Sequence, residues 1–544
     1  MTHLDQNTEI LGLRRAKHLL RRTSFNYSKD LLQEFAALTP EQAFNKLVVD
    51  EPNLWKEPYD PKPDTAPDGY WISSKKDPRE FEGQFRKRRI ITSWWWYNSL
   101  HKNSLKQKMM FFLHTSFTVS KDNGSGTSTS FYDHMSLLEH YALGNLKTLS
   151  KKITFDNSML DYLNNTQNNA NNPNENYARE FLELFTILKG EQIGSGDYTN
   201  YTEQDVQQAA RVFSGIKIEH ERNIIDSDTN LPIGKIKINA HAKVDKTFSH
   251  AFDNFVVKGS DTEDGVVKEL DDFVEMVFSK EATAISFVRK LYRYFVKSEW
   301  NTTIEQNVIK PLAFELRANN YEVLPTLKKL LLSNHFYDLD NADDSDEIIG
   351  SIVKSPLQLL NELTSFFKIE IPNPETAVDD FYVFFNFVHN FYLATAGMKF
   401  WAPDSVAGYP AHYQSPDFDR HWFSSNTVLS RYKLIESLIT GRNKIFYNGK
   451  IRVELNTPNF IKNNINEPSI ASDLITELAD YLYPESISVE RKAYFAQNLL
   501  EGFPDYYWTN AWLEFDASGD ETVVKSRLDA LIIQMINAPE FQLT

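Results

Sequence analysis

The sequence predicts a mainly α-helical protein, built as one large multi-helix domain or as two interlocked lobes. Along most of its 544 residues, apolar side chains recur at spacings of three and four, which places them on one face of a helix. One segment, around residues 216–250, shows the alternation typical of strands instead. The apolar period is not sustained over successive heptads, which disfavours a coiled coil.

Helix starts and stops divide the periodic stretches into separate elements. Thr202 and Asp205 form an S/T-x-x-D pair that resembles a capping box, and Ser104 and Gln107 form a second such pair. The predicted helices are Leu11–Leu20, Lys29–Ala37, Pro40–Val49, Glu80–Leu100, Leu105–Phe117, Met135–Leu143, Asn176–Leu188, Glu203–Ser214, Gly265–Val277, Ala282–Val296, Thr303–Ala318, Pro325–Leu332, Pro356–Phe367, Ala377–Leu393, Ser425–Ile439, Ser469–Leu482, Val489–Leu500 and Val523–Ile536.

The exception is a predicted β-hairpin. A turn-like stretch, Asp226–Gly234, separates two runs in which isoleucine alternates with other residues: Ile216 and Ile218, then Ile233, Ile236 and Ile238. Alternation on both sides of a turn predicts two short antiparallel strands. This hairpin would be a small insertion in a helical protein.

Charge and composition narrow the classes of partner. The net charge of −16 disfavours nucleic acid, whose phosphates need a basic surface. The chain has no cysteine, which excludes disulfides and cysteine-ligated metal centres. Aromatic residues reach 13%, which favours a thick aromatic core or aromatic-lined clefts.

The sequence also bears on compartment and membrane. No apolar core follows the basic residues near the N-terminus, so we expect no signal peptide and a cytoplasmic location by default. The most apolar stretch, Phe381–Trp401, is interrupted by polar residues such as Asn386 and Lys399. We therefore expect a buried helix there and no transmembrane segment.

The stretch Asn171–Gly215 offers the first candidate site. In its first helix, one face is apolar, and Glu175, Arg179 and Glu183 lie four residues apart on another face. Glu180 falls at the edge of the apolar stripe, where a carboxylate needs a partner or a raised pKa. Two carboxylates in unequal environments suit acid–base catalysis. The alternative is an ion-pair network that orients neighbouring helices.

His114 is the candidate partner for those carboxylates. It ends a helix that is apolar nearly all round, so it lies in or beside the core. There it is either a core histidine with satisfied hydrogen bonds or a general base whose pKa is tuned by burial. The second hypothesis predicts a hydrolase or lyase that uses His114 with Glu175 or Glu180.

Residues 400–431 form the best candidate binding site. This long segment is rich in aromatic and basic side chains and shows few signals for regular structure; the candidate ligand-binding residues are Trp401, Tyr409, His412, Trp422 and Arg431. Such a loop either lines a cleft or plugs the core. Lining a cleft, its rings would stack on a glycan or hold a peptide.

Metal and cofactor motifs are absent from the sequence. His220, His241 and His250 are too scattered to form a local metal motif, and neither H-E-x-x-H nor H-x-H occurs. No glycine-rich phosphate loop is present either. The sequence therefore predicts no metal site and leaves any cofactor unknown.

Seven segments resemble the large bacterial family called domain of unknown function 1800. They are AKHLLRRTSFNYS (Ala16–Ser28), FFLHTSF (Phe111–Phe117), SMLDYLNN (Ser158–Asn165), PNENYARE-x-LELFT with YTE-x-DV-x-x-AAR-x-x-SG, KSP (Lys354–Pro356), FWAP…VAGYP (Phe400–Pro410) and APEFQL (Ala538–Leu543). The resemblance implies one family domain over residues 11–544. We divide it into an N-terminal lobe of about 11–215, a hairpin insertion of about 216–258 and a C-terminal helical lobe of about 259–544.

The chain departs from the family pattern at three positions. Asp404 replaces a proline, Tyr409 replaces a tryptophan, and Ala242 follows His241 where the family has His-Asp. A binding role of His241 that depends on that aspartate is therefore in question in this chain.

The resemblance implies no reaction, since the family has no assigned activity. Its genes often lie beside those for a sulfatase-like family, which makes such a protein a candidate partner, and its members are often exported. We favour a binding or scaffold protein of the envelope with an aromatic-lined cleft, the hydrolase or lyase being the alternative.

The two candidate segments provide complementary halves of such a cleft. We predict that the 400–431 loop packs against the polar side of helix 176–188, beside Glu180 and Glu183. Arg431 and His412 are the loop residues expected nearest to those carboxylates.

Overall fold

The computed structural model describes residues 3–49, 57–60, 69–74, 78–80, 82–340, 347–441 and 453–544, and helices dominate them. The predicted mainly α-helical class is confirmed. The α-helices are α1 Gly12–Thr23, α2 Lys29–Ala36, α3 Pro40–Leu47, α4 Gln84–Leu100, α5 Leu105–Ser116, α6 Ser128–His140, α7 Leu146–Ile153, α8 Asn157–Tyr162, α9 Asn176–Glu180, α10 Glu203–Val212, α11 Glu263–Ser279, α12 Glu281–Phe295, α13 Thr302–Ile304, α14 Lys310–Ala318, α15 Val323–Leu331, α16 Pro356–Phe366, α17 Val378–Val388, α18 Pro410–Tyr413, α19 Val428–Thr440, α20 Thr457–Asn464, α21 Ala471–Leu482, α22 Val489–Leu500, α23 Asp505–Ser518 and α24 Thr522–Asn537.

Several helices were not predicted from periodicity. Helices α7 and α20 each span eight residues, about two turns, so few apolar repeats can register. Helix α23 is longer, but it buries only Trp508 and Trp512 and keeps other large apolar side chains exposed. Its sequence therefore lacks a continuous apolar stripe.

The two predicted capping boxes have different outcomes. At α10 the box is present: the Thr202 backbone N–H donates to Asp205 Oδ2 at 2.8 Å, and Thr202 Oγ1 accepts from the Asp205 backbone. At α5 the prediction is wrong, since Ser104 makes no capping hydrogen bond. Gln107 instead donates to Glu139 Oε1 at 3.0 Å, because a neighbouring helix offers a buried carboxylate.

Three two-stranded antiparallel sheets occur in the described part of the chain. The predicted hairpin forms from β3 Ile216–Lys217 and β4 Lys235–Ile236, with Ile216 opposite Ile236. The other two sheets pair β1 Gln192–Gly194 with β2 Asp197–Tyr198, and β5 Lys246–Thr247 with β6 Val256–Val257. Strands of two or three residues are too short to show alternation, which is why these sheets were not predicted.

The predicted helix 176–188 changes its hydrogen bonding halfway. After α9, residues Phe181–Phe185 form a π-helical turn, η3, and the Thr186 N–H bonds to the Phe181 carbonyl at 3.1 Å. Leu188 then takes a positive φ of 63°, a conformation that costs energy for a residue other than glycine. Such π-turns are frequent at functional sites, because they turn side chains away from the regular helical stripe.

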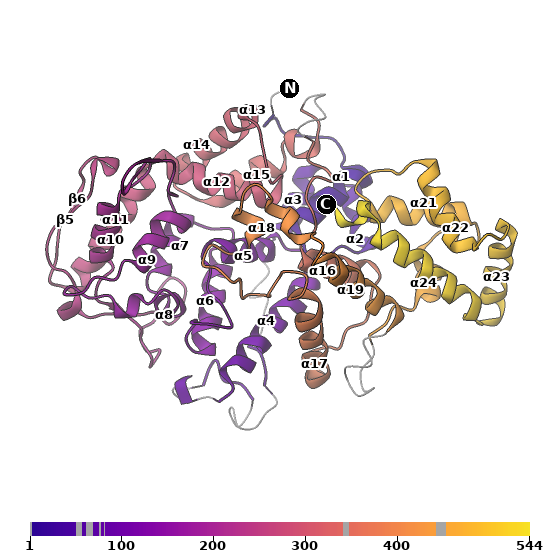
Figure 1. Ribbon diagram of the computed structural model, residues 1–544, viewed down its shortest axis with the longest axis horizontal. Helices are drawn as coiled ribbons and strands as arrows, with labels where there is room; N and C mark the ends of the chain where they lie inside the picture. Colours follow the sequence, from indigo (N-terminus) through magenta and orange to yellow (C-terminus); the bar gives the residue numbers. More distant parts are fainter. Residues whose placement is uncertain are drawn as a thin grey trace.

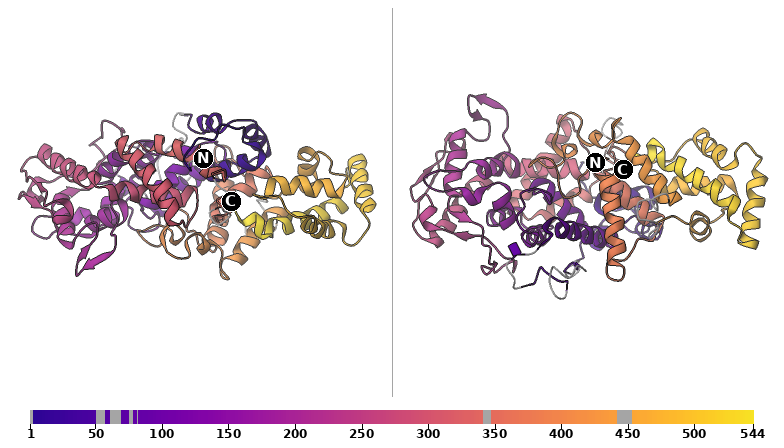
Figure 2. Two further views of the ribbon diagram at one scale, coloured as in Figure 1. Left: turned by 90° about the horizontal axis from the view of Figure 1, so that it is seen from above. Right: turned by 60° about the horizontal axis from the view of Figure 1, so that its bottom comes forward.

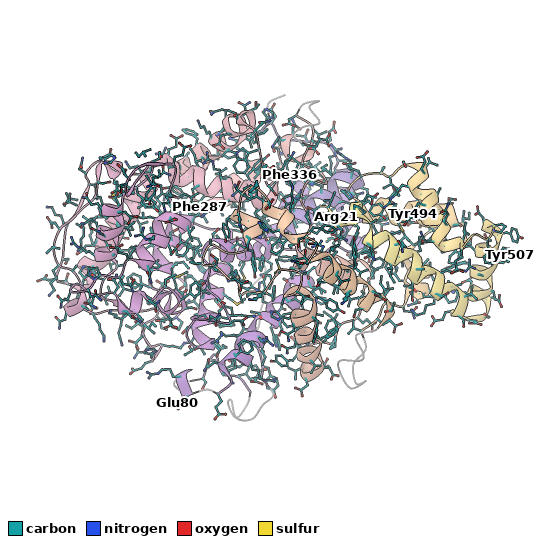
Figure 3. All side chains as sticks on the ribbon, viewed as in Figure 1. Arg21, Glu80, Phe287, Phe336, Tyr494 and Tyr507 are labelled. Carbon is teal, nitrogen blue, oxygen red and sulfur yellow. The ribbon has the colours of Figure 1, made fainter. Side chains whose placement is uncertain are left out.

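The molecule is elongated, and the two ends of the described chain meet near its middle (Figures 1 and 2). Helices α7–α11 lie at one end and α21–α24 at the other. Helix α1 packs between them: Lys17 donates to the Asp480 carbonyl at 2.7 Å, and Arg22 donates to the Thr544 carbonyl at 2.9 Å. Arg21, on the same helix, lies near the centre, whereas Tyr507 marks the far end of the C-terminal helices (Figure 3).

An aromatic cluster forms the core beside α1. Trp94, Trp95 and Trp96 of α4 are all buried, and the Trp95 ring stacks on Phe111 with centroids 5.7 Å apart. Phe400 and Trp401 complete the cluster against both rings. Helix α11 packs on α7 and α10, so elements from both sides of residue 259 lie together; the division into lobes stays a prediction.

The apolar stretch Phe381–Trp401 is no membrane span. It contains α17 and a second π-helical turn, η9 His389–Leu393, and then leaves the helix. Across the described residues, no helix is long and apolar enough to cross a membrane.

Candidate functional site

A cavity lined by many basic side chains lies at the centre of the protein, beside α1. It has a volume of about 70 Å³ and is lined by five basic side chains: Arg21, Arg22, Lys108, Arg293 and Lys354. Asp419 is the one acidic side chain among the described residues that line it. Because the whole chain carries a net charge of −16, this concentration of positive charge is local and opposite to the average.

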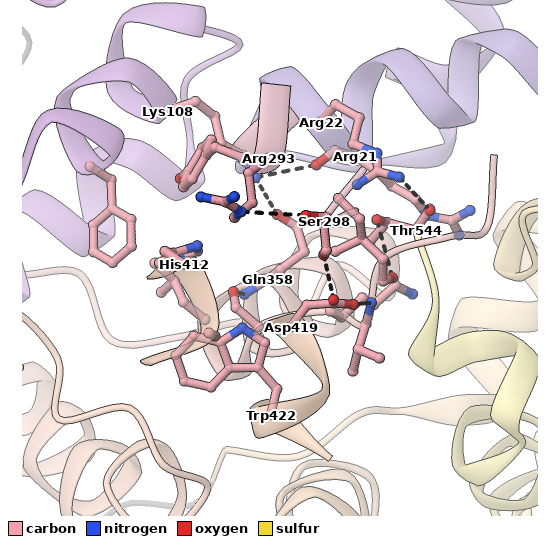
Figure 4. A pocket seen from close by; sticks show the side chains of 18 of the residues that line it. Arg21, Arg22, Lys108, Arg293, Ser298, Gln358, His412, Asp419, Trp422 and Thr544 are labelled. Atoms are coloured by element: carbon pink, nitrogen blue, oxygen red, sulfur yellow. Dashed lines mark hydrogen bonds between the residues drawn. The ribbon is translucent and has the colours of Figure 1, made fainter. Parts of the chain in front are cut away.

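Several separate elements bring these side chains together. Arg21 and Arg22 end α1, where the negative end of the helix dipole favours cations. Lys108 comes from the first turn of α5 and Arg293 from the last turn of α12. Lys354 precedes α16, and in Figure 4 Lys108, Arg293 and Gln358 point toward one another.

The start of α16 faces the cavity. Ser355 caps this helix by accepting from the Gln358 backbone N–H at 3.1 Å, and Pro356 occupies its first turn. Ser355, Leu357 and Gln358 all line the cavity. The positive end of the helix dipole therefore adds to the charge of the basic side chains.

Internal carboxylates neutralise part of this charge. Glu362 lies 2.8 Å from Arg21 Nη2 and 2.9 Å from Lys354 Nζ, and all three side chains are fully buried. Asp419 accepts from the Val353 N–H at 2.7 Å and from the Ser298 hydroxyl. Arg22 donates to the backbone oxygens of Ile348 and Thr544, and Lys108 donates to the Arg21 carbonyl and to Gln358. Among the described residues, no aspartate or glutamate side chain forms an ion pair with either cation.

Burial without enough counter-charge depresses the pKa values of the cations. Burial, reinforced by the charge of Arg22, lowers the pKa of Lys108 to about 7. Burial lowers the pKa of Arg22 to about 9 and that of Arg293 to about 10. His412 has its pKa lowered to about 4 by burial and then by Arg293. The charged forms of these side chains are therefore disfavoured in the cavity, and a bound anion would favour them.

Several buried donors in the cavity have no acceptor. Among the described residues, nothing accepts from Arg21 Nη1, Arg22 Nε or Gln358 Nε2, although each residue is at least nine-tenths buried. Buried polar atoms are nearly always hydrogen-bonded, so unpartnered donors around a cavity call for water or a ligand with acceptor oxygens.

A second, larger cavity of about 270 Å³ adjoins the first. Arg293, Tyr294 and His412 line both. The rest of its lining is mixed, from Phe112 and Leu184 to Arg289 and Lys290. The two spaces together form a small cationic chamber next to a larger one that is lined by aromatic, apolar and basic side chains.

The predicted binding residues of the 400–431 loop divide into two groups. His412, on α18, and Trp422, on η10 Phe418–Trp422, line the cationic cavity. Trp401 and Tyr409 are buried in the core, where both pack on Phe111, so they plug the core. The loop therefore does both things that the sequence suggested: His412 and Trp422 line a cavity, and Trp401 and Tyr409 plug the core.

Arg431 stabilises the segment that carries Lys354. It is buried, and it donates to Gln542 Oε1 at 2.8 Å and to the Lys354 carbonyl at 2.9 Å. Among the described residues it makes no hydrogen bond or ion pair with Glu180 or Glu183, so its expected position near them stays a prediction. Arg431 fixes the backbone that carries Lys354.

The charged face of helix 176–188 forms an ion-pair network. Arg179 makes two hydrogen bonds of 2.7 Å to the Glu203 carboxylate and one of 3.1 Å to Glu175. Glu183 accepts from Tyr201 Oη at 3.2 Å and lies 3.4 Å from Lys189 Nζ. This network joins the helix to α10 and to the β1–β2 hairpin.

Glu180 differs from its neighbours. It is half-buried and accepts no hydrogen bond from any described residue. Burial, and then the charge of Glu183, raise its pKa to about 7. Of the predicted catalytic carboxylates, this one has the properties of a general acid or base.

We expect Glu180→Gln to change the pH dependence of stability. The folded protein keeps a proton on Glu180 between about 4.5 and 7 that the unfolded chain releases, so this group lowers stability as the pH rises through that window. The variant should therefore melt at a higher temperature than wild type at pH 8, and the difference should vanish at pH 4. Melting curves across this range check it, with exposed Glu191→Gln as the control; parallel curves for wild type and Glu180→Gln would contradict it.

Helix 176–188 and the 400–431 loop line one cavity together, but with side chains other than those predicted. Leu184 and Leu188 line the second cavity together with Ala407, His412 and Tyr413. The helix thus presents the end of its apolar stripe to the cavity, with Leu184 in the π-turn and Leu188 after it, and not its polar side. The two segments meet, but Glu180 and Glu183 are not among the lining residues.

His114 and His241 are both core histidines. His114 is fully buried, its Nε2 lies 2.9 Å from the Val119 carbonyl, and burial lowers its pKa to about 3. It makes no hydrogen bond to Glu175 or Glu180 among the described residues, so their pairing stays a prediction. His241 Nδ1 bonds to the Ser214 carbonyl at 2.7 Å, and its Nε2 lies 3.2 Å from Glu269 Oε2, beside buried Lys246.

The basic residues of the cavity were not singled out from the sequence. Lys108 and Arg293 each lie on a helix whose neighbouring residues are apolar. A lone cation on a buried helix face is costly unless it has a counter-charge, and this signal could have marked both residues. Their convergence with Arg21, Arg22 and Lys354 depends on the tertiary fold and leaves no local motif.

Comparison with known proteins gives a family and no activity. Residues 18–543 match the sequence model of a family described as a protein of unknown function, DUF1800. The chain belongs to the DUF1800 family. No curated protein and no solved structure matches it.

Five of the seven segments that resemble this family contribute lining residues to the two cavities. Arg21, Arg22 and Phe25 come from Ala16–Ser28, and Phe111 comes from Phe111–Phe117. Lys354 and Ser355 come from the KSP segment, and Ala407 from the Phe400–Pro410 segment. Motifs spread over most of this DUF1800 chain therefore meet at one place.

Proposed function

We propose that this DUF1800 protein binds a small ligand bearing an oxyanion, such as a phosphate, sulfate or carboxylate group, in the cationic cavity. One observation carries the proposal: Arg21, Arg22 and Gln358 line the cavity, and each has a buried donor with no acceptor among the described residues. An oxyanion supplies several acceptor oxygens and the missing negative charge together. Water would supply acceptor oxygens but not the negative charge.

The basic side chains that line the cavity determine which ligands it favours energetically. A charged hydrogen bond contributes about 1.5–3 kcal/mol, more than a neutral one. Arginine is suited to oxyanions, because its planar fork matches two of their oxygens. A cavity with three arginines and two lysines is therefore matched to an oxyanion and mismatched to a neutral or cationic ligand.

The adjoining space supports a ligand larger than a single ion. Tyr294 and His412 line both cavities, and Trp422 lies 6.0 Å from the His412 ring. Such rings stack on sugar rings or hold peptide side chains. We therefore propose an anionic glycan fragment or an acidic peptide as the ligand class, in keeping with a binding or scaffold protein of the envelope. A sulfatase-like partner stays a prediction, to be tested by pull-down of the native protein.

Replacing Arg293 with methionine should weaken binding of the oxyanion by about 10–100-fold, the loss of one charged hydrogen bond. The only hydrogen bond that Arg293 donates among the described residues is a long one, 3.3 Å, to the Ser298 carbonyl, so the change removes one weak hydrogen bond from that acceptor. Isothermal titration with sulfate, phosphate and citrate measures the affinities.

Arg317→Met is the matched control. It removes an exposed arginine from α14, outside both cavities, and should leave the affinities unchanged. If wild type binds none of the three anions, or if both variants bind them equally well, the proposed function is wrong.

Acid–base catalysis is the second candidate function, and Glu180 is the observation that favours it. This half-buried carboxyl group has a pKa of about 7 and no hydrogen-bond donor among the described residues. His114 is a less suitable partner than expected, because burial keeps its ring neutral. A hydrolase or lyase activity that disappears in Glu180→Gln, with melting temperature preserved at pH 4, would support this candidate over a purely binding role.

A further inference from the structure

Three side chains with metal-binding atoms meet at the edge of the N-terminal segment. They are His3, His335 and Asp340, whose ligand atoms all lie within 4.8 Å of one another. His335 and Asp340 are nearly completely buried, and His3 is 17% exposed. No local spacing motif could indicate this set, because His3 and Asp340 are 337 residues apart.

Both imidazoles point to the same carboxylate oxygen. His335 Nδ1 lies 2.8 Å from Asp340 Oδ2, and His3 Nδ1 contacts that oxygen too. Two histidines and one carboxylate are a common ligand set for Zn²⁺ and other first-row divalent ions. Zinc takes histidine nitrogen and carboxylate oxygen at about 2.0–2.2 Å, so ligand atoms this close need only small shifts to surround one ion.

The second nitrogen of His335 has its own partner. His335 Nε2 lies 2.8 Å from the hydroxyl of Tyr292, on α12. When Nε2 carries the proton and donates it to Tyr292, Nδ1 presents a lone pair toward Asp340 and His3. A histidine that ligates a metal usually donates its other ring N–H in this way, which fixes the tautomer and the ring orientation. In the opposite tautomer, Nδ1 would donate to Asp340 and the cluster would hold no metal.

Backbone hydrogen bonds carry His3 to this position. The Asn7 N–H bonds to the Leu332 carbonyl, the Asn334 N–H to the Asp5 carbonyl, and the His335 N–H to the His3 carbonyl, at 2.8–2.9 Å. The segment from His3 to Asn7 therefore runs along the turn that contains His335. A metal bound by His3 would tie this segment to the body of the protein.

We propose that His3, His335 and Asp340 form a binding site for one zinc-type divalent ion, with the fourth position open to water. The site is separate from the cationic cavity and does not depend on the proposed function. Its role is to fasten residues 3–7 against residues 332–340, since two of its ligands come from one side of this contact and one from the other.

The experiment uses the full-length protein after chelator treatment and dialysis. Titration with Zn²⁺ by calorimetry, and with Co²⁺ by visible absorption, should give one equivalent of tight binding, and the Co²⁺ spectrum should be that of a four-coordinate site. His3→Ala and Asp340→Asn should each weaken the affinity by at least about 100-fold, the upper end of the effect known for outer-shell partners. Tyr292→Phe should weaken it by about 10–100-fold.

Two comparisons keep the test decisive. His250→Ala removes an exposed histidine that lies 4.0 Å from Asp197, so it reports weak surface binding and should leave the one-equivalent affinity unchanged. His3→Ala alters a residue at the edge of the fold, and added Zn²⁺ should slow backbone hydrogen exchange of residues 3–7 in wild type but not in this variant. Absence of stoichiometric binding in wild type, or equal binding by wild type and His3→Ala, would show a hydrogen-bonded cluster only and overturn the proposal.

Discussion

Replacing Glu362 with glutamine should lower the free energy of unfolding by about 3–5 kcal/mol, the cost of breaking a buried ion pair. Glu362 is the counter-ion of both Arg21 and Lys354, and none of the three side chains reaches solvent. Glutamine has nearly the same shape, so the loss isolates the charge. Urea unfolding followed by tryptophan fluorescence measures it.

The two cations should respond differently to the loss of Glu362. Burial already lowers the pKa of Lys354 well below its ordinary value, so this lysine can become neutral. At Arg21, burial lowers the pKa but Glu362 outweighs this effect and raises it, so this arginine keeps its proton far more firmly than the lysine. Arg21 is therefore left as a buried, unpaired charge, which accounts for most of the expected loss.

Two further variants test that explanation. Replacing the whole group by apolar residues, in Arg21→Met with Lys354→Met and Glu362→Leu, should recover most of the lost stability, because no charge then remains buried. Glu485→Gln removes the carboxylate of the exposed Arg14–Glu485 pair and should have little effect. If Glu362→Gln unfolds like wild type, or if the triple variant is as unstable as the single one, the buried charge is not the cause.

Local patterns predicted most of the helices but could not predict the cavity. A helix is encoded by neighbours in sequence, so spacing and caps located α10 with its capping box and the buried tryptophans of α4. The cavity is assembled from residues 21, 108, 293, 354 and 412, and only the tertiary fold brings them together. Family resemblance marked several of these segments without saying that they meet.

The incorrect details share a physical origin. The π-turn at η3 is invisible to a helical period, and it gives the second cavity Leu184 and Leu188 where the polar side of the helix was expected. Ser104 and Gln107 were expected to form a capping box, but Ser104 makes no capping hydrogen bond and Gln107 bonds to Glu139 on another helix. Here a hydrogen bond to a residue distant in sequence replaced the local one that the sequence predicted.

Sulfate affinity should fall about 50-fold between pH 7 and pH 9 if an oxyanion binds beside Lys108. Burial and Arg22 lower the pKa of Lys108 to about 7, so the free protein loses this charge as the pH rises above 7. A bound anion stabilises the protonated form, so binding takes up one proton, and affinity then falls up to tenfold per pH unit. Sulfate is the probe because its own charge does not change over this range.

The pH dependence separates Lys108 from other buried lysines. Lys108→Met should bind sulfate more weakly at pH 6 and with little change up to pH 9. Lys17 is the matched control: burial lowers its pKa to about 7 as well, but it lies outside the cavity and donates to the Asp480 and Tyr483 carbonyls. Lys17→Met should therefore keep the wild-type slope.

Without the anion, the stability of the folded protein should rise with pH, whereas the sulfate affinity falls. Because the unfolded chain keeps the Lys108 proton up to about pH 10.5 and the folded protein releases it near 7, this group makes folding more favourable as the pH rises through that window. Sulfate should therefore raise the melting temperature most at pH 6 to 7 and least at pH 9. A sulfate affinity that is independent of pH in wild type, or one whose slope survives in Lys108→Met, would place the anion away from Lys108 and refute this location of the binding site.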